Sequence, residues 1–265
     1  MSLGIYESGR LKYKFFGKRF IMDLLDTVPI PRKTMVLFFI VDTSGSMMGS
    51  KIGEVNSAIE EVIPELKELS ESNADAQIKI AVLEFSSGAR WLTPNGPIEV
   101  VNYFWNDMDA SGVTDLGDAC LQLNEKLSTK AFMQEATGSF APAIFLLSDG
   151  GPTDDYKSGI DMLKQNNWFK KAIKVAVAIG ADADKAVLEE FTGSREAVLE
   201  VHTPAMLRKM IKFISIRASE IASRSANVGG DDDGADSKQD AFIDELNNFK
   251  VEVVDSADDD DADVW

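Results

Sequence analysis

The feature that most restricts the fold of this chain is a set of short, continuous apolar runs separated by helical patterns. The first run covers residues 35–41, and similar runs cover residues 143–147 and 173–179, the last interrupted only by Lys174. Apolar residues at every position, rather than at every second one, indicate strands that are buried on both faces. Such strands need helices on both sides of the sheet. The amphipathic patterns between the runs supply them, and the order predicts a three-layer, doubly wound α/β fold with a mostly parallel sheet.

The remaining patterns complete this sheet. Residues 77–85 alternate and indicate a strand, and residues 90–92 form its hairpin partner, which adds one antiparallel edge strand. Pro64 is expected to bend the helix of residues 51–72 or to end its first half. Residues 98–103 fit either a short strand or a loop. We expect the other helices at residues 116–132, 155–165, 185–191 and 206–223, and a second edge strand at residues 197–201.

Three loops at expected strand or helix ends carry oxygen-bearing side chains. Asp42, Ser44 and Ser46 follow the first apolar run, Thr114 comes just before a helical pattern, and Asp149 follows the second run. Carboxylates and hydroxyls are the hard oxygen ligands that Mg²⁺ prefers. Open parallel sheets place ligand sites at the carboxyl ends of their strands. The sequence therefore predicts a metal site made by these five residues.

Each loop also has a purely structural interpretation. Asp and Ser are common in turns and at helix N-caps, so Asp-x-Ser-x-Ser alone is a weak signal. Thr114 alone fits a helix N-cap, and Asp149 alone fits a turn ahead of Pro152. The metal-site hypothesis depends on the combination of all three loops in this order.

With these residues the chain resembles the von Willebrand factor A (vWA) family and its metal-ion-dependent adhesion site. The pattern of that site is Asp-x-Ser-x-Ser, a later Thr, and an Asp at the end of a later strand. The resemblance covers about residues 35–225. It implies that the three hydroxyl side chains bind the metal directly and that the two carboxylates act largely through bound waters; in this chain these are Ser44, Ser46 and Thr114, and Asp42 and Asp149.

Two further stretches, residues 149–155 and 168–180, look like the bacterial TerY-like branch of the family, which is associated with tellurite resistance. This resemblance implies a cytoplasmic protein of a stress-response or signalling system, with kinase-like or phosphatase-like proteins among its partners. One departure is the stretch Gly112-Val113-Thr114, where many members have Gly-Gly-Thr.

The expected site suits binding rather than catalysis. Neutral hydroxyls, with carboxylates one water away, leave a divalent ion incompletely neutralised, so an Asp or Glu of another protein can complete its shell. We therefore expect a protein-interaction module that uses Mg²⁺ or Mn²⁺, and no enzyme.

The alternative is a metal-dependent hydrolase or phosphatase that uses the same loops. The aspartate-nucleophile phosphatase pattern has an acid where this chain has Ser44. Neither a Gly-x-Ser-x-Gly elbow around Ser44 or Ser46 nor a Walker-type phosphate loop is present. A Ser–His–acid triad would depend on His202, the only histidine.

Charge divides the chain into three expected parts: a basic extension (residues 1–30), the vWA-like domain (31–225) and an acidic tail (226–265). The tail has 12 Asp and 2 Glu against 2 Lys, so it carries −12 of the net charge of −17. Nucleic acid is not expected as a partner, because phosphate attraction needs a basic face. The basic extension is interpreted either as an amphipathic arm for a membrane surface or partner, or as residues upstream of a true start at Met22.

The acidic tail is expected to be flexible, with one short amphipathic helix whose apolar stripe ends at Phe249. It fits a solvated tail, a docking peptide for a partner, or a lid that presents a carboxylate to the metal. If it is a lid, deleting residues 226–265 should tighten metal-linked binding. The single cysteine, Cys120, is expected to be buried and indicates a reducing compartment. No apolar run approaches the ~20 residues of a spanning helix, so no membrane segment is expected.

Overall fold

The computed structural model describes residues 32–74, 76–134, 138–223 and 234–256. The predicted basic extension, including Met22, lies outside the described residues. So do residues 226–233 and 257–265 of the predicted acidic tail. The predictions made for those segments stay predictions.

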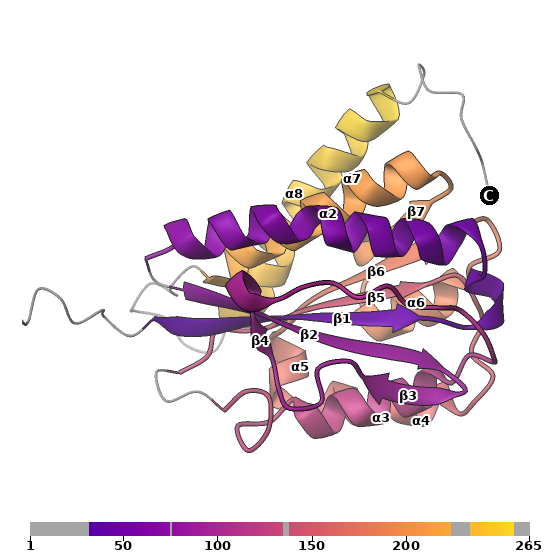
Figure 1. Ribbon diagram of the computed structural model, residues 1–265, viewed down its shortest axis with the longest axis horizontal. Coiled ribbons are helices and arrows are strands. Elements are labelled where there is room, and N and C mark those ends of the chain that lie inside the picture. Colours follow the sequence, from indigo (N-terminus) through magenta and orange to yellow (C-terminus); the bar gives the residue numbers. More distant parts are fainter. Residues whose placement is uncertain (1–31, 75, 135–137, 224–233, 257–265) are drawn as a thin grey trace, which may run out of the picture. The chain divides into compact units, whose positions relative to one another are not determined.

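A seven-stranded sheet lies at the centre of residues 32–223 (Figure 1). Its strands are Lys33–Asp42 (β1), Ala76–Ser86 (β2), Gly88–Trp91 (β3), Ile98–Glu99 (β4), Ala143–Ser148 (β5), Ile173–Ile179 (β6) and Val198–Val201 (β7). The order is β3-β2-β1-β5-β6-β7, and all neighbours from β2 to β7 pair in parallel. β3 pairs with β2 in the antiparallel direction, which confirms the predicted edge hairpin. The two-residue β4 also pairs with β2.

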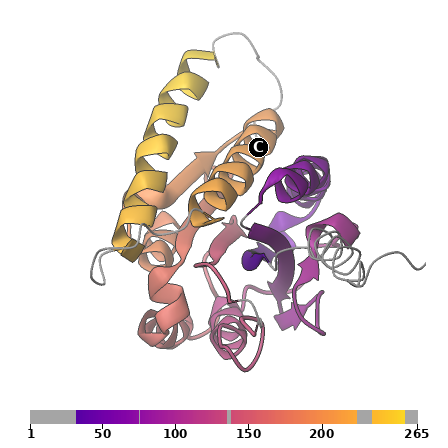
Figure 2. The same cartoon turned by 90° about the vertical axis from the view of Figure 1, so that its left-hand side faces the viewer.

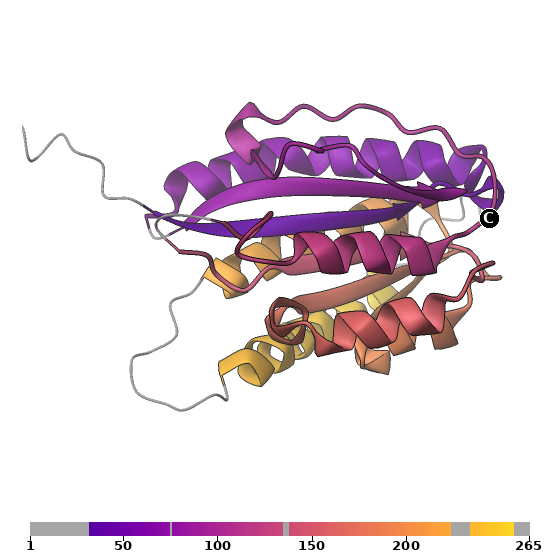
Figure 3. The same ribbon diagram turned by 90° about the horizontal axis from the view of Figure 1, so that it is seen from below.

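Helices cover both faces of this sheet (Figures 2 and 3). They are Ser50–Ser72 (α2), Leu116–Lys126 (α3), Tyr156–Gln165 (α4), Asn167–Lys171 (α5), Lys185–Thr192 (α6), Pro204–Ser223 (α7) and Gly234–Ser256 (α8). Three single turns of 3₁₀ helix add Gly45–Met47 (η1), Val100–Asn102 (η2) and Arg195–Ala197 (η3).

Strand β1 shows why its apolar run is continuous. Leu37 and Phe39 belong to the core formed with α2, α7 and α8, whereas Phe38 and Ile40 belong to the core formed with α3 to α6. All four side chains are at most 1% exposed. A strand with a helix layer on each face has no solvent side, and this confirms the predicted three-layer α/β fold.

The structure corrects the predicted helix of residues 116–132, because α3 ends at Lys126. The Asn166 side chain stops it there: its amide nitrogen donates to the carbonyl oxygen of Leu127 at 3.0 Å. The same side chain accepts from the Trp168 backbone N–H at 2.8 Å and so caps α5, a helix that was not predicted. Pro64 lies inside α2, which continues past it to Ser72, so the helix does not end there.

The amphipathic segment of the predicted tail lies in α8, which is 23 residues long rather than short. Its apolar stripe packs on the domain: Phe242 and Leu246 are fully buried, and the Phe249 ring stacks on that of Phe213 with centroids 3.9 Å apart. At its start, the Gln239 side chain bonds the backbone N–H and C=O of Lys174 at 2.9 and 3.2 Å. Within residues 238–249, α8 is therefore a docked helix.

None of the helices in the described residues combines the length and apolar character needed to cross a membrane.

Candidate metal centre

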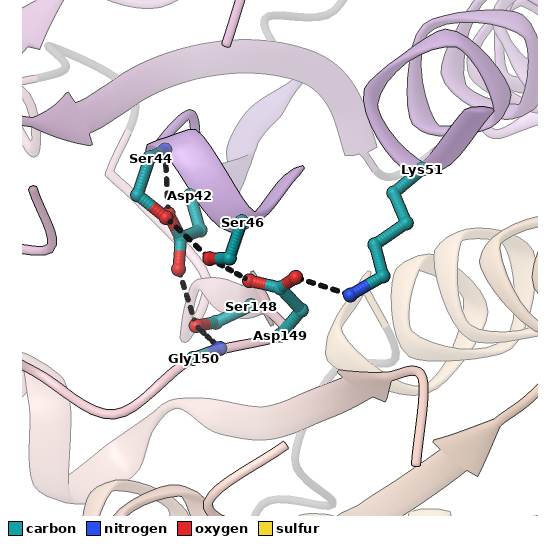
Figure 4. A network of polar contacts seen from close by, with 7 residues as sticks. All are labelled: Asp42, Ser44, Ser46, Lys51, Ser148, Asp149 and Gly150. Atoms are coloured by element: carbon teal, nitrogen blue, oxygen red, sulfur yellow. Dashed lines mark hydrogen bonds and ion pairs between the residues drawn. The ribbon is translucent and has the colours of Figure 1, made fainter. Parts of the chain in front are cut away.

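The five predicted site residues lie at the carboxyl edge of the sheet, and Figure 4 shows all of them except Thr114. Asp42 is the last residue of β1, and Ser44 and Ser46 lie in the turn that forms η1. Asp149 follows β5 directly, and Thr114 lies two residues before α3. Neighbouring parallel strands end at the same edge, which is why segments more than a hundred residues apart meet here.

The first loop is organised by the Asp42 carboxylate, which is completely buried. Its Oδ1 accepts the Ser44 backbone N–H at 2.8 Å, a local turn that the Asp-x-Ser spacing favours. The turn brings the hydroxyl oxygens of Ser44 and Ser46 to 3.1 Å from each other. Thr43 anchors the loop, because its backbone N–H donates to the carbonyl oxygen of Phe85 at 2.8 Å.

The second loop is joined to the first by side chains (Figure 4). The Ser46 hydroxyl donates to Asp149 Oδ1 at 2.7 Å, and the Lys51 ammonium pairs with Asp149 Oδ2. The Ser148 hydroxyl donates to Asp42 Oδ2 at 2.6 Å. The register explains this bond: Val41 lies opposite Leu147, so the next residues of the two strands are neighbours.

The third loop brings Thr114 to the same point. A Cβ on Gly150 would lie 3.3 Å from the Ser46 hydroxyl oxygen and 3.7 Å from the Thr114 hydroxyl oxygen. Both hydroxyls therefore face the Gly150 backbone. The segment is held in place by Gly112, whose φ of 85° suits only glycine and whose C=O accepts the Gly45 N–H at 3.1 Å.

The structure differs from the N-cap interpretation of Thr114, and it gives Asp149 side-chain partners beyond those of a simple turn. The N-cap residue of α3 is Asp115, and the first amides of that helix donate to Asp154 at 2.9 and 3.0 Å. The hydroxyl of Thr114 is left to face Gly150. Asp149 is bonded to Ser46 and Lys51 rather than forming only a turn.

The electrostatics of the two carboxylates differ. Burial raises the pKa of Asp42; bonds from Ser148 and Ser44 oppose this, and the nearby Asp149 charge adds to it. In the described part of the chain no cationic side chain pairs with Asp42, whereas Asp149 has Lys51. A buried carboxylate without a counter-charge is costly, and a cation between the two would remove that cost.

The donor set is chemically uniform. Asp42, Asp149, Ser44, Ser46 and Thr114 offer only oxygen atoms, which fits a hard divalent cation. Among the described residues, no three His, Cys, Asp or Glu side chains gather as a metal-binding cluster, so a cation here would depend on the hydroxyls.

Sequence reasoning missed Ser148, Lys51 and Thr153. Thr153 accepts the Thr114 N–H at 3.1 Å through its hydroxyl. The signal for Ser148 was its place as the last strand residue before Asp149, but its bond to Asp42 depends on strand register. Of the other singled-out residues, Cys120 is 1% exposed, and its burial raises the pKa of the thiol. His202 lies half-exposed beside Glu200, with 3.9 Å between Nε2 and Oε2.

A family model for the von Willebrand factor type A domain matches residues 37–212, which is well over half of the chain. The chain belongs to the von Willebrand factor type A family. Domains of this vWA family commonly mediate protein–protein interactions and are generally not enzymes.

One relative of the vWA chain is the inter-alpha-trypsin inhibitor heavy chain H4 of Bos taurus, 28% identical over 190 residues. The match covers 66% of this chain but only 19% of the relative, so this chain spans about a fifth of that protein.

Solved structures share the fold. A von Willebrand factor type A protein from Catenulispora acidiphila has a TM-score of 0.52 at 19% identity, covering 70% of this chain and 43% of that one. Proximal thread matrix protein 1 of the mussel byssus has a TM-score of 0.53 at 16% identity, covering 71% and 48%. The pilus adhesin SpaC of Lactobacillus rhamnosus GG has a TM-score of 0.54 at 13% identity, covering 72% and 30%. At these identities the likeness shows the fold alone.

Proposed function

We propose that this vWA domain is a divalent-metal-dependent protein-interaction module. Ser44, Ser46 and Thr114 would hold Mg²⁺ or Mn²⁺ directly, and Asp42 and Asp149 would act largely through bound waters. The observation that carries the proposal is the convergence of these oxygen atoms from three loops around a buried Asp42 that has no counter-charge among the described residues.

The bound ion would supply a positive centre that a carboxylate of a partner completes. The residues of this chain favour such a contact with a partner's carboxylate. Three of the donors are neutral hydroxyls, so the net negative charge around the ion stays low. The Lys51 ammonium already neutralises part of the Asp149 charge. An incoming Asp or Glu therefore meets little repulsion and gains charge-assisted contacts.

The TerY-like resemblance is the basis for a proposal about the cellular role of this module. We propose a cytoplasmic role in bacterial stress response or signalling, tellurite resistance included, with kinase-like or phosphatase-like proteins among the partners. The residues that support it are those of the two stretches 149–155 and 168–180.

We propose no catalytic role for the site. The hydroxyls of Ser44 and Ser46 bond to each other and to Asp149 rather than to a histidine base. His202 follows β7, and β7 is three strands from β1 in the sheet order. At ~4.8 Å per strand this is roughly 14 Å, too far for a direct proton transfer from Ser44.

Calorimetric titration with Mg²⁺ and Mn²⁺ tests the proposal. The parent should show saturable binding in the millimolar range or tighter. Asp42→Ala and Ser46→Ala should lose about 100-fold or more in affinity, because each removes an oxygen that the site needs. Ser46 is exposed, so Ser46→Ala should keep the fold. This variant therefore still tests the proposal if Asp42→Ala does not fold.

Asp161→Ala is the matched control, since Asp161 is an exposed acid on α4. It should bind metal as the parent does, and circular dichroism should show all variants folded. Absence of any heat from the parent with either metal would refute the proposal.

A further inference from the structure

A groove lies beside the candidate metal centre. Its volume is about 680 Å³, within the range of ordinary ligand sites. Thr43 and Ser111 form one wall, and the Ser111 N–H donates to the Thr43 carbonyl oxygen at 2.7 Å. Because Thr43 stands between Asp42 and Ser44, the groove and the metal centre share a border. A partner that places a carboxylate on the metal would have its neighbouring residues at this groove.

The groove is acidic. Four charged side chains line it, and two of them, Glu84 and Arg90, neutralise each other through a bond of 2.8 Å. The other two, Asp107 and Asp109, are exposed and form no ion pair with any described residue. The lining therefore carries two uncompensated negative charges next to a centre that would attract a carboxylate.

These two acids are held in place by a buried clamp. The Asn56 side chain of α2 donates to the Met108 carbonyl oxygen and accepts the Met108 N–H, both at 3.0 Å. The Trp105 indole N–H also donates to Asn56, at 3.3 Å. With the Met108 backbone fixed and its side chain buried, Asp107 and Asp109 on either side of it stay exposed along the groove. An acidic pair on a fixed backbone loses little entropy on binding a cation.

The metal-centre loops and the groove also carry exposed apolar side chains. Six large apolar side chains are exposed among the described residues. Two of them flank the metal-centre loops: Met48 (64% exposed) lies two residues after Ser46, and Val113 (47%) precedes Thr114. Phe104 (75%) lines the groove, and Lys67 lies 4.7 Å from the centre of its ring. Exposed apolar side chains around a polar centre are typical of a protein-binding face.

We propose that the partner is a protein segment that carries a basic residue close to its metal-binding carboxylate. The carboxylate completes the metal shell, and the Lys or Arg side chain lies in the groove against Asp107 and Asp109. Met48 and Val113 contact apolar residues of the partner that lie between its carboxylate and its basic residue. This inference rests on the proposed function, since the metal positions the first of these contacts.

Selection from displayed random peptides in Mg²⁺ tests the inference without knowledge of the natural partner. Peptides selected for binding to the parent protein should be enriched in sequences in which Asp or Glu stands at a fixed spacing from Lys or Arg. Peptides selected on Asp107→Asn/Asp109→Asn should still be enriched in Asp or Glu but no longer in Lys or Arg. Asp107→Lys/Asp109→Lys should select a second acid in its place. Asp161→Asn/Asp244→Asn, which removes two exposed acids elsewhere, should select as the parent does.

A peptide selected by the parent should then bind Asp107→Asn/Asp109→Asn about threefold to tenfold more weakly, with a smaller salt dependence. Acid enrichment without base enrichment on the parent would overturn the inference and leave the proposed function standing. Base enrichment that persists in Asp107→Asn/Asp109→Asn would overturn the assignment to this groove. Selection without acid enrichment, insensitive to a chelator, would overturn both.

Discussion

A buried aspartate lies at the end of β1 and another directly after the neighbouring β5, yet the two carboxylates are held in different ways. Asp42, at the end of β1, is bonded by a backbone amide of its own turn and by the Ser148 hydroxyl, without a cationic partner in the described residues. Asp149, after β5, is paired with Lys51 and bonded by Ser46. One carboxylate is satisfied by dipoles alone, and the other has a counter-charge.

The difference is the basis for the cation proposed at this edge. Dipoles from a hydroxyl and an amide only partly offset the burial of Asp42, and its pKa stays raised. Lys51 supplies one positive charge for two carboxylates. A divalent ion near both would complete the Asp42 side without displacing the structure that holds Asp149.

Among changes that leave all five proposed donors in place, the largest effect is expected at Gly150, where the two strand ends and Thr114 meet. In Gly150→Ala the new Cβ would lie 3.3 Å from the Ser46 hydroxyl oxygen, so that hydroxyl must move by a few tenths of an ångström. We expect Mg²⁺ affinity to fall about tenfold, as for other changes that misplace a ligand, with the fold preserved. Calorimetry measures the affinity.

Gly151→Ala is the matched control for this change. Its nearest atom would be Asp184 Oδ2 at 3.9 Å, an ordinary contact, so its affinity should equal that of the parent. Equal losses in both variants would show that the loop after β5, rather than the meeting point of the hydroxyls, limits binding.

A smaller effect is expected at Lys51, which makes the two aspartates unequal. Lys51→Met should raise Mg²⁺ affinity about threefold to tenfold, because a positive charge beside the cation site is removed. Lys209→Met, a change of an exposed lysine on α7, should leave the affinity unchanged. A lower affinity in Lys51→Met would show instead that the lysine is needed to orient Asp149.

The smallest effect is expected in the stability of the metal-free protein. The folded-state pKa of Asp42 is raised above its ordinary value of 3.8, so this group favours folding below pH 3.8 and loses that contribution as pH rises through the folded pKa. Asp42→Asn avoids the buried charge. In chelator at pH 7 its Tm should exceed that of the parent by about 2–4 °C, which corresponds to about 1 kcal/mol.

The advantage of Asp42→Asn should disappear as the pH falls below 3.8, where the parent carboxyl is protonated in both states. Thermal unfolding followed by circular dichroism across this pH range measures it. A variant less stable than the parent at pH 7 would mean that the bonds from Ser148 and Ser44 outweigh the cost of burial.

Local patterns predicted the main strands, most of the helices and the candidate site residues. Continuous apolar runs predicted β1, β5 and β6 because a strand buried on two faces leaves no polar positions. Asp42, Ser44 and Ser46 were candidates because oxygen-bearing side chains directly follow a buried strand, and parallel sheets place ligand sites at the carboxyl ends of their strands. The length of α8 could not be predicted, because its apolar stripe is stabilised by Phe213 of α7, far away in the sequence.

The sequence by itself determined the layered fold, the edge at which a site would form and the oxygen character of its donors, since these follow from periodicity and residue type. Only the tertiary structure decided which groups meet there. The parallel register placed Ser148 against Asp42, and α2 brought Lys51 to Asp149. Helix α2 also placed Asn56 against Met108, which lines the groove. Such contacts depend on how elements far apart in the sequence pack together, and no local sequence pattern encodes that packing.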